Sequence, residues 1–326
     1  MYAELEAARK SKVLAYITGD RPGMETQIHP EVYDKFVNHL DLIGVVEKIS
    51  LYLYTRGGNT LAAWSLVNLI RQFCDEFEVI IPSKAHSAGT LMSLGANTIV
   101  MTKQATLGPI DPSITTPLNP QIAGASPDAR YPVSVEAVSG FLDLAKKDLN
   151  INDEANLASL LSHLSDKIHP LVLGAVFRSK SQIQMLARKL IKAQVTDEAM
   201  VEKVVSFLCS ESGSHDYTIH RREARNGLGL NIEKPDDELY ALVKRIYDDI
   251  VQELCLDTKF DIGNVLSGQP QAPYSFRRAL IESCSGGTDF LVSEGIFVQR
   301  QVQIQPGVMQ TAIEDQRTFE GWRHEN

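Results

Sequence analysis

The stretch LYLYTRGGNTLAAWSLVNLIRQF, residues 51–73, decides the fold class of this chain. It begins inside an apolar run, residues 48–55, whose leucine and aromatic side chains predict a strand. Gly57 and Gly58 end that run, and the helix expected after them carries apolar side chains nearly all round. A strand that turns at two glycines into a buried helix is typical of a parallel α/β fold.

The same pattern of strand, turn and helix repeats on both sides of this stretch. Further short apolar runs in the first third of the chain predict strands at residues 12–18, 78–82 and 97–102. From residue 133 to about residue 208 the apolar period is helical, and strand-like runs return at residues 277–283, 289–294 and 296–304. We therefore expect a parallel sheet covered by helices, followed by a mostly helical addition.

These changes of pattern divide the chain into three parts. We expect a core over residues 1–132, a helical addition with C-terminal strands over residues 133–305, and a flexible polar tail over residues 306–326. Residues 112–132 are rich in Pro, Ser, Thr and Gly and have no period, which predicts a long loop. A loop of this length beside a site is a candidate lid.

Composition excludes several classes of protein. The chain has 326 residues, 44% of them hydrophobic, and a net charge of −9, which argues against a nucleic-acid binder because phosphates require a basic face. No apolar run reaches the roughly 18–20 residues of a membrane span, and the first residues lack the apolar core of a signal peptide. The four cysteines are far apart and form no metal motif. We expect a cytoplasmic protein with no metal and no cofactor.

Two turns between a strand and a helix carry residues suited to acyl chemistry. Gly57 and Gly58 can present backbone N–H groups without an obstructing Cβ, as an oxyanion or enolate requires. Ser87 lies in the second turn, Lys84-Ala85-His86-Ser87-Ala88, where its hydroxyl would project from the start of a buried helix. Both features also have purely structural interpretations, a tight turn and a helix N-cap.

Candidate acids and bases follow later in the chain. Asp111 is in the rigid sequence Gly-Pro-Ile-Asp-Pro, which would hold an orienting carboxylate, although an Asp-Pro turn is the simpler interpretation. His215 lies in a loop and could act as a base, with His220 as a weaker alternative. His86 is adjacent to Ser87, but neighbouring side chains on such a bend usually diverge.

Taken together, these motifs resemble the Clp protease/crotonase superfamily. The ordered set LYLYTRGGNTLAAWSLVNLIRQF, AHSAGTLMSLGA, TLGPIDPSI and SHDYTIHRREA is most similar to the serine dehydrogenase proteinase (SDH-type) family, related to signal peptide peptidase A. The resemblance implies a spiral of strand–strand–helix units, Ser87 as nucleophile, and an oxyanion hole at Gly57-Gly58 with the amides of Gly57 and Ala88 as donors. It also implies a Ser, Asp, His order, which Asp111 and His215 fit best.

The base has a second candidate within the same superfamily. Signal peptide peptidases use a Ser–Lys dyad with the lysine in a later helix, and Lys146 or Lys147 would be the equivalent here. A lysine removed from water can lose its proton and serve as a base.

The expected function is an ATP-independent serine peptidase that cleaves peptides or unfolded proteins and assembles as a homo-oligomer. An apolar helical stretch at residues 171–177, and C-terminal strands that would otherwise leave an open sheet edge, would supply subunit contacts. Two other functions keep the same fold. One is a crotonase-like acyl or thioester enzyme without a serine nucleophile, and the other is a non-catalytic pseudo-protease scaffold.

Overall fold

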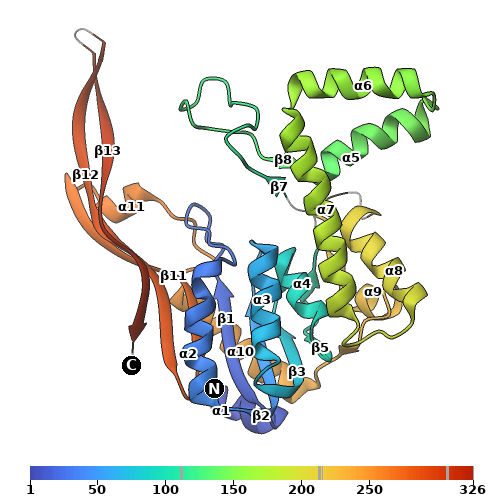
Figure 1. The fold of residues 1–326 in the computed structure, drawn as a ribbon. Coiled ribbons are helices and arrows are strands. Elements are labelled where there is room, and N and C mark those ends of the chain that lie inside the picture. The colour runs from blue at the N-terminus through green and yellow to red at the C-terminus, as the bar shows by residue number, and fades with distance from the viewer. Residues whose placement is uncertain (111–112, 212–213, 215, 306–307, 326) are drawn as a thin grey trace.

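A computed structural model describes residues 1–110, 113–211, 214, 216–305 and 308–325. Its largest feature is a mixed sheet with the strand order β10-β5-β3-β2-β1-β11-β12-β13 (Figure 1). The strands are β1 (Lys12–Thr18), β2 (Val46–Tyr54), β3 (Cys74–Ile81), β5 (Thr98–Met101), β10 (Ile232–Glu233), β11 (Gln271–Ser283), β12 (Gly287–Gln305) and β13 (Val308–Glu325). The first five in this order are parallel, and β11 to β13 are antiparallel.

Helices cover both faces of this sheet (Figure 1). One face packs against η1 (Pro30–Val32), α2 (Tyr33–Ile43), α3 (Thr60–Ile70), α4 (Ala88–Leu94), α7 (Pro170–Ile191) and α8 (Glu198–Ser206). The other face packs against α1 (Tyr2–Arg9) and α10 (Asp237–Glu253). This covering confirms the expected Clp/crotonase-like α/β fold class.

Strand β1 is a continuous apolar run because its side chains enter the core on both faces of the sheet. Leu14 and Tyr16 point into the core on the α2 and α3 side, whereas Val13, Ala15 and Ile17 point toward α1 and α10. All five side chains are fully buried, because helices cover both faces of the sheet at this central strand. Each large side chain buried here contributes about 1.5–3 kcal/mol to stability.

A smaller sheet sits beside the carboxyl end of β2. It consists of β4 (Lys84–Ala85), β6 (Thr106–Leu107) and β9 (Ile219–His220), followed by α9 (Arg221–Asn226). The Thr55 N–H donates to the Lys84 carbonyl at 3.1 Å, and the His86 N–H donates to the Thr55 carbonyl at 3.0 Å. These two bonds join the end of β2 to β4.

A helical arm stands above the sheet in Figure 1. It contains α5 (Val135–Asp143), η2 (Leu144–Asp148), α6 (Glu154–Lys167) and the first turns of α7, and η3 (Phe207–Glu211) follows α8. The short pair β7 (Ser113–Ile114) and β8 (Val133–Ser134) closes the loop that precedes the arm. This arm is the predicted mostly helical addition after residue 133.

The C-terminal segment differs from the expected flexible tail. Residues 308–325 form β13, which pairs with β12 along its length, and α11 (Ile262–Leu266) precedes β11. Arg323 of β13 makes two 2.8 Å bonds to the Glu294 carboxylate of β12, and it also lies over the ring of Phe319 in its own strand. The expectation was wrong for these residues because cross-strand pairs stabilise a strand whose sequence looks polar.

Candidate active site

Ser87 lies on a strained bend between β4 and α4. Its backbone has φ 52° and ψ −114°, a conformation that side-chain-bearing residues rarely adopt. Ser87 occupies the N-cap position, yet its side chain accepts no hydrogen bond from the helix amides. The Ser87 side chain therefore does not cap α4, and its hydroxyl is not used to hold the helix N-terminus.

Gly57 packs directly against this serine. A Cβ on Gly57 would lie 2.7 Å from the Ser87 Cβ and 3.2 Å from its Oγ, and Gly57 has φ +116°. Gly58 has φ +141° and lies equally close to the preceding segment, since its Cβ would lie 2.4 Å from the Ile28 carbonyl oxygen. Both glycines are thus required by close approach as well as by backbone conformation.

The two expected oxyanion donors differ in their hydrogen bonding. The Ala88 N–H is the first amide of α4, where a helix has no internal acceptor. The Gly57 N–H instead donates to Thr55 Oγ1 at 2.9 Å. In this conformation the Gly57 amide is engaged inside the protein, which the sequence did not predict.

The directions of β4, β6 and β9 bring the chain segments next to the other predicted site residues to one edge of the small sheet. Strand β4 is parallel to β6, so the chain leaves both strands, toward Ser87 and Gly108, at one edge of the small sheet. Strand β9 is antiparallel to β6, so the loop that precedes Ile219 reaches the same edge. The Ile110 N–H also donates to the Leu208 carbonyl at 2.8 Å, which joins these two loops.

Asp111 and His215 belong to those two loops but lie outside the described residues. Their side-chain positions are therefore not part of the observed geometry. The described ends of these segments, at Ser87, Gly108 and Ile219, lie at one edge of the three-stranded sheet.

The two other candidate histidines are tied to β6. The Nε2 of His86 lies 2.9 Å from Thr106 Oγ1, and its ring packs against Gly108. His220 is paired with Thr106 in β9 and is exposed at the start of α9. Thr106 of β6 thus contacts His86 through its side chain and pairs with His220 through its backbone.

Residues 42–167 match the sequence model of the family described as ClpP-like SDH-type serine proteinase. This segment contains Gly57, Gly58 and Ser87, and the fold class agrees with the ClpP-like description.

Two curated proteins of Methanocaldococcus jannaschii are similar to the chain. MJ0137 is 27% identical over 197 residues, which cover 60% of this chain and 57% of the relative, and MJ1495 is 26% identical over 188 residues, which cover 57% and 53%. The chain therefore spans about half the length of the curated relatives it matches.

Solved structures with a similar fold include two proteases. A mutant of the 1510-N membrane-bound stomatin-specific protease has 16% identity and a TM-score of 0.37, with 72% of this chain and 85% of that chain covered. ClpP1 from Listeria monocytogenes has 13% identity and a TM-score of 0.38, with 73% and 99% covered. Within the described ranges of the present chain, no helix is long and apolar enough to span a bilayer.

The candidate lysine bases lie on the helical arm. Lys146 and Lys147 are in η2 and both are exposed. The Lys147 side chain is 72% exposed and pairs with Asp143 at 3.0 Å, while Lys146 lines a groove between α5, α6 and α7. A lysine base depends on removal from water, and the structure gives neither lysine that environment.

The loop expected over residues 112–132 has an ordered centre around Asn119. Asn119 is 4% exposed, and its amide donates to the carbonyls of Ile114 and Tyr131 at 2.6 and 2.8 Å. Its Oδ1 accepts from the Thr116 N–H at 2.9 Å. Asn119 thus pins the two halves of the loop together, and the role of the loop as a lid stays a prediction.

A Ser–His–Asp arrangement that the sequence did not reveal lies elsewhere in the chain. His39 Nδ1 is 2.8 Å from Ser283 Oγ, and its Nε2 is 3.2 Å from Asp289 Oδ2. All three residues are buried, and the Gly286 N–H donates to Ser283 Oγ at 3.0 Å. Because Oγ is enclosed, we interpret these residues, called here the His39 clasp, as a tie between α2 and the β11–β12 turn.

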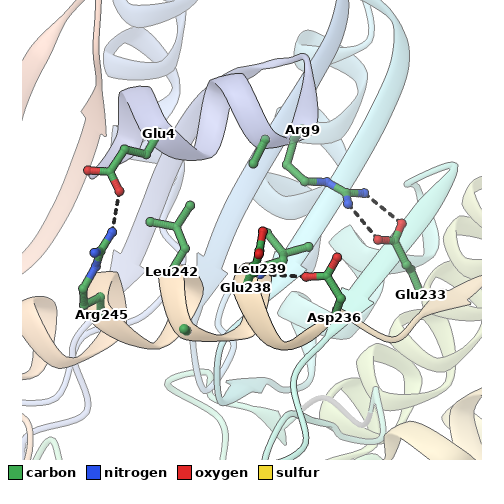
Figure 2. Close-up of a pocket in the computed structure, with 10 residues that line it drawn as sticks. Glu4, Arg9, Glu233, Asp236, Glu238, Leu239, Leu242 and Arg245 are labelled. Atoms are coloured by element: carbon green, nitrogen blue, oxygen red, sulfur yellow. Dashed lines mark hydrogen bonds and ion pairs between the residues drawn. The ribbon is translucent and has the colours of Figure 1, made fainter.

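A polar hollow of about 500 Å³ lies between α1 and α10, on the sheet face opposite α4 (Figure 2). Its charged side chains are joined in pairs: Arg9 bonds Glu233 at 2.7 Å, and Arg245 bonds Glu4. Asp236 caps α10 by accepting from the Leu239 N–H at 2.8 Å. These interactions stabilise the fold, so the candidate active site remains the Ser87 bend.

Proposed function

We propose that this chain is a serine peptidase with Ser87 as its nucleophile. The observation that carries the proposal is the strained Ser87 bend, whose hydroxyl does not cap its helix and which lies in direct contact with Gly57. Strain at a bend that exposes a hydroxyl is a feature of nucleophile turns in acyl-transfer enzymes. The match of residues 42–167 to the sequence model of an SDH-type serine proteinase family supports the same chemistry.

The proposed reaction follows acyl transfer. Ser87 Oγ attacks the scissile carbonyl carbon while His215 takes the hydroxyl proton, and Asp111 orients the imidazole. His215 then gives that proton to the leaving amine as the C–N bond breaks, which leaves an acyl-enzyme that water hydrolyses. The Ala88 and Gly57 amides would stabilise the oxyanion. Support comes from the strand directions, which lead all three triad segments to one edge.

The proposed substrates are peptides or unfolded proteins, cleaved without ATP in the cytoplasm by a homo-oligomer. Large apolar side chains on the arm and α7 support assembly: Leu161, Leu171 and Phe177 are 52%, 66% and 72% exposed. Exposed apolar surface of this kind normally marks a contact between molecules. Light scattering should give a mass at least twice the 36.1 kDa of one chain.

The experiment that tests the function compares wild type with Ser87→Ala on casein and short peptides. We expect hydrolysis by the wild type that chelators do not inhibit, and a loss of at least about 1,000-fold in the variant. Equal hydrolysis by both proteins would contradict the proposal and favour an acyl enzyme without a serine nucleophile. An intact oligomer with no hydrolysis under any condition would favour a scaffold.

A further inference from the structure

Two buried threonines connect the core to the glycine turn. The Thr18 hydroxyl donates to Thr55 Oγ1 at 2.6 Å, and Thr55 Oγ1 accepts the Gly57 N–H at 2.9 Å. Thr18 and Thr55 are 1% and 0% exposed. A hydroxyl oxygen that accepts twice inside a dry core makes strong directional bonds, since no water competes for its lone pairs.

The same threonine is wedged against the serine helix. A Cβ on Gly89 would lie 2.4 Å from Thr55 Cγ2, so this methyl group fills the space beside the second residue of α4. The Thr55 N–H and carbonyl are both bonded to β4. The hydroxyl therefore has a fixed position, and the Gly57 N–H that points to it points into the core.

This geometry bears on the oxyanion hole. A peptide N–H has one hydrogen, and an N–H whose nitrogen lies 2.9 Å from Thr55 Oγ1 and donates to it cannot at the same time make a full bond to a developing oxyanion. Gly57 has no Cβ and adopts φ +116°, and a glycine can take φ values on either side of zero, as a change in direction of the Arg56–Gly57 peptide requires.

We propose that Thr55 is a latch on the oxyanion hole: its hydroxyl holds the Gly57 N–H inward and keeps the resting site one donor short. Productive binding of a substrate carbonyl turns this N–H outward. Thr55 is then a positioning residue that regulates Ser87 reactivity without touching substrate. The inference rests on the proposed peptidase function and deepens it.

The proposal fixes the direction of a substitution effect. Thr55→Val has nearly the same shape and keeps a methyl group against Gly89, but it removes the acceptor of the Gly57 N–H. The outward peptide is then favoured, because an inward N–H facing a methyl group has no partner. One buried neutral hydrogen bond corresponds to about a three- to tenfold change in population, and labelling of Ser87 should accelerate by that factor.

The test measures the second-order rate of Ser87 labelling by a fluorophosphonate in wild type, Thr55→Val, Thr55→Ser and Thr18→Val. Thr55→Ser keeps the acceptor, and Thr18→Val removes a hydroxyl one bond further away, so both should label at the wild-type rate. Hydrogen exchange of the peptide that contains Gly57 should accelerate only in Thr55→Val. A purely structural threonine would instead give slower labelling in that variant.

The outcomes separate the latch from the proposed function. If wild type is labelled at Ser87 and folded Thr55→Val is labelled at the same rate or more slowly, the latch is wrong and the peptidase proposal stands. If Ser87 of the wild type is not labelled, the proposed function itself fails. Should Thr55→Val not fold, Thr55→Ala also lacks the acceptor and should label faster than Thr55→Ser, and the reverse order would overturn the latch.

Discussion

Gly57 and Ser87 touch with no space between them: a Cβ on the glycine would lie 2.7 Å from the serine Cβ. Real Cβ atoms do not approach so closely, so any side chain at position 57 must displace the nucleophile. The contact links the proposed oxyanion turn to the proposed nucleophile through backbone geometry alone.

Gly57→Ala should therefore abolish the proposed peptidase activity without removing any chemical group. We expect a loss of about 100-fold or more in the rate of peptide hydrolysis, because displacement of a nucleophile by about 1 Å has an effect of that size. The positive φ should add a loss of about 1–3 kcal/mol in the free energy of unfolding. Hydrolysis assays and urea unfolding measure the two effects.

The matched control is Gly174→Ala in α7. A Cβ on Gly174 would meet nothing within 4 Å, and alanine favours helix over glycine, so stability should rise by about 0.5–1 kcal/mol with unchanged hydrolysis. If Gly57→Ala behaves like this control, the proposed contact between turn and nucleophile has no catalytic importance.

The identity of the base is open to a direct comparison. His215→Ala should lower the rate of hydrolysis by about 1,000-fold or more, since loss of one triad member removes most of the catalysis. Lys146→Ala and Lys147→Ala should leave the rate unchanged, because both lysines are exposed on the arm. Inactivation by either lysine substitution together with an active His215→Ala would replace the triad by a Ser–Lys dyad.

The His39 clasp should make stability depend on pH. Burial lowers the pKa of His39 from 6.5 more than the neighbouring Asp289 raises it, with Lys35 and His324 as the other charged neighbours. A depressed histidine pKa means that the unfolded chain binds the proton first. The contribution of His39 is therefore complete above about pH 6.5 and is lost as pH falls below it.

Urea unfolding of wild type and His39→Gln between pH 7.5 and 5 tests this dependence. Glutamine keeps a donor and an acceptor but does not titrate in this range. We expect wild type to exceed the variant most at pH 7.5 and the gap to shrink by at most about 1.4 kcal/mol per pH unit toward pH 5. A gap that stays constant or widens would show that His39 is not held neutral.

A buried carboxylate on the opposite face should dominate the electrostatic part of stability. Glu78 is fully buried in β3, where it bonds Arg9 and accepts from Ser50 at 2.8 Å. Burial alone would raise its pKa, but Arg9, Ser50 and Lys48 together hold the pKa of Glu78 below its ordinary value.

Glu78→Gln should cost about 3 kcal/mol in the free energy of unfolding, because it leaves buried cations without their full partner. Glu202→Gln, which breaks an exposed pair with Arg188, is the matched control and should have no measurable effect. Equal unfolding midpoints for the two variants would contradict this role of Glu78.

The core strands could be predicted because each is a continuous run of apolar residues, which is visible in the sequence without knowledge of its neighbours. Strand β1 has the bounds expected from its apolar run, and β2 begins two residues earlier than predicted. The sequence of β13 is polar and has no apolar run, because this strand is stabilised by its pairing with β12 and not by burial of its own side chains. The expected flexible tail followed from that lack of local signal.

The site was predictable only where its residues are neighbours in sequence. Gly57 and Ser87 each follow a recognisable strand, but β6 meets β9 more than 100 residues later. The His39 clasp joins residues 244 and 250 positions apart, and no motif marks it. The bond from Gly57 to Thr55 depends on the direction of one peptide, which sequence does not specify.

The most direct test of the central claim is to map the residue modified by a fluorophosphonate on the intact wild-type protein, Ser87→Ala and Ser283→Ala. The account predicts one adduct per chain on Ser87 in the wild type and in Ser283→Ala, and no adduct in Ser87→Ala, because Ser283 Oγ is enclosed by His39 and Gly286. A wild type modified at Ser283, or not modified at all, would contradict the account.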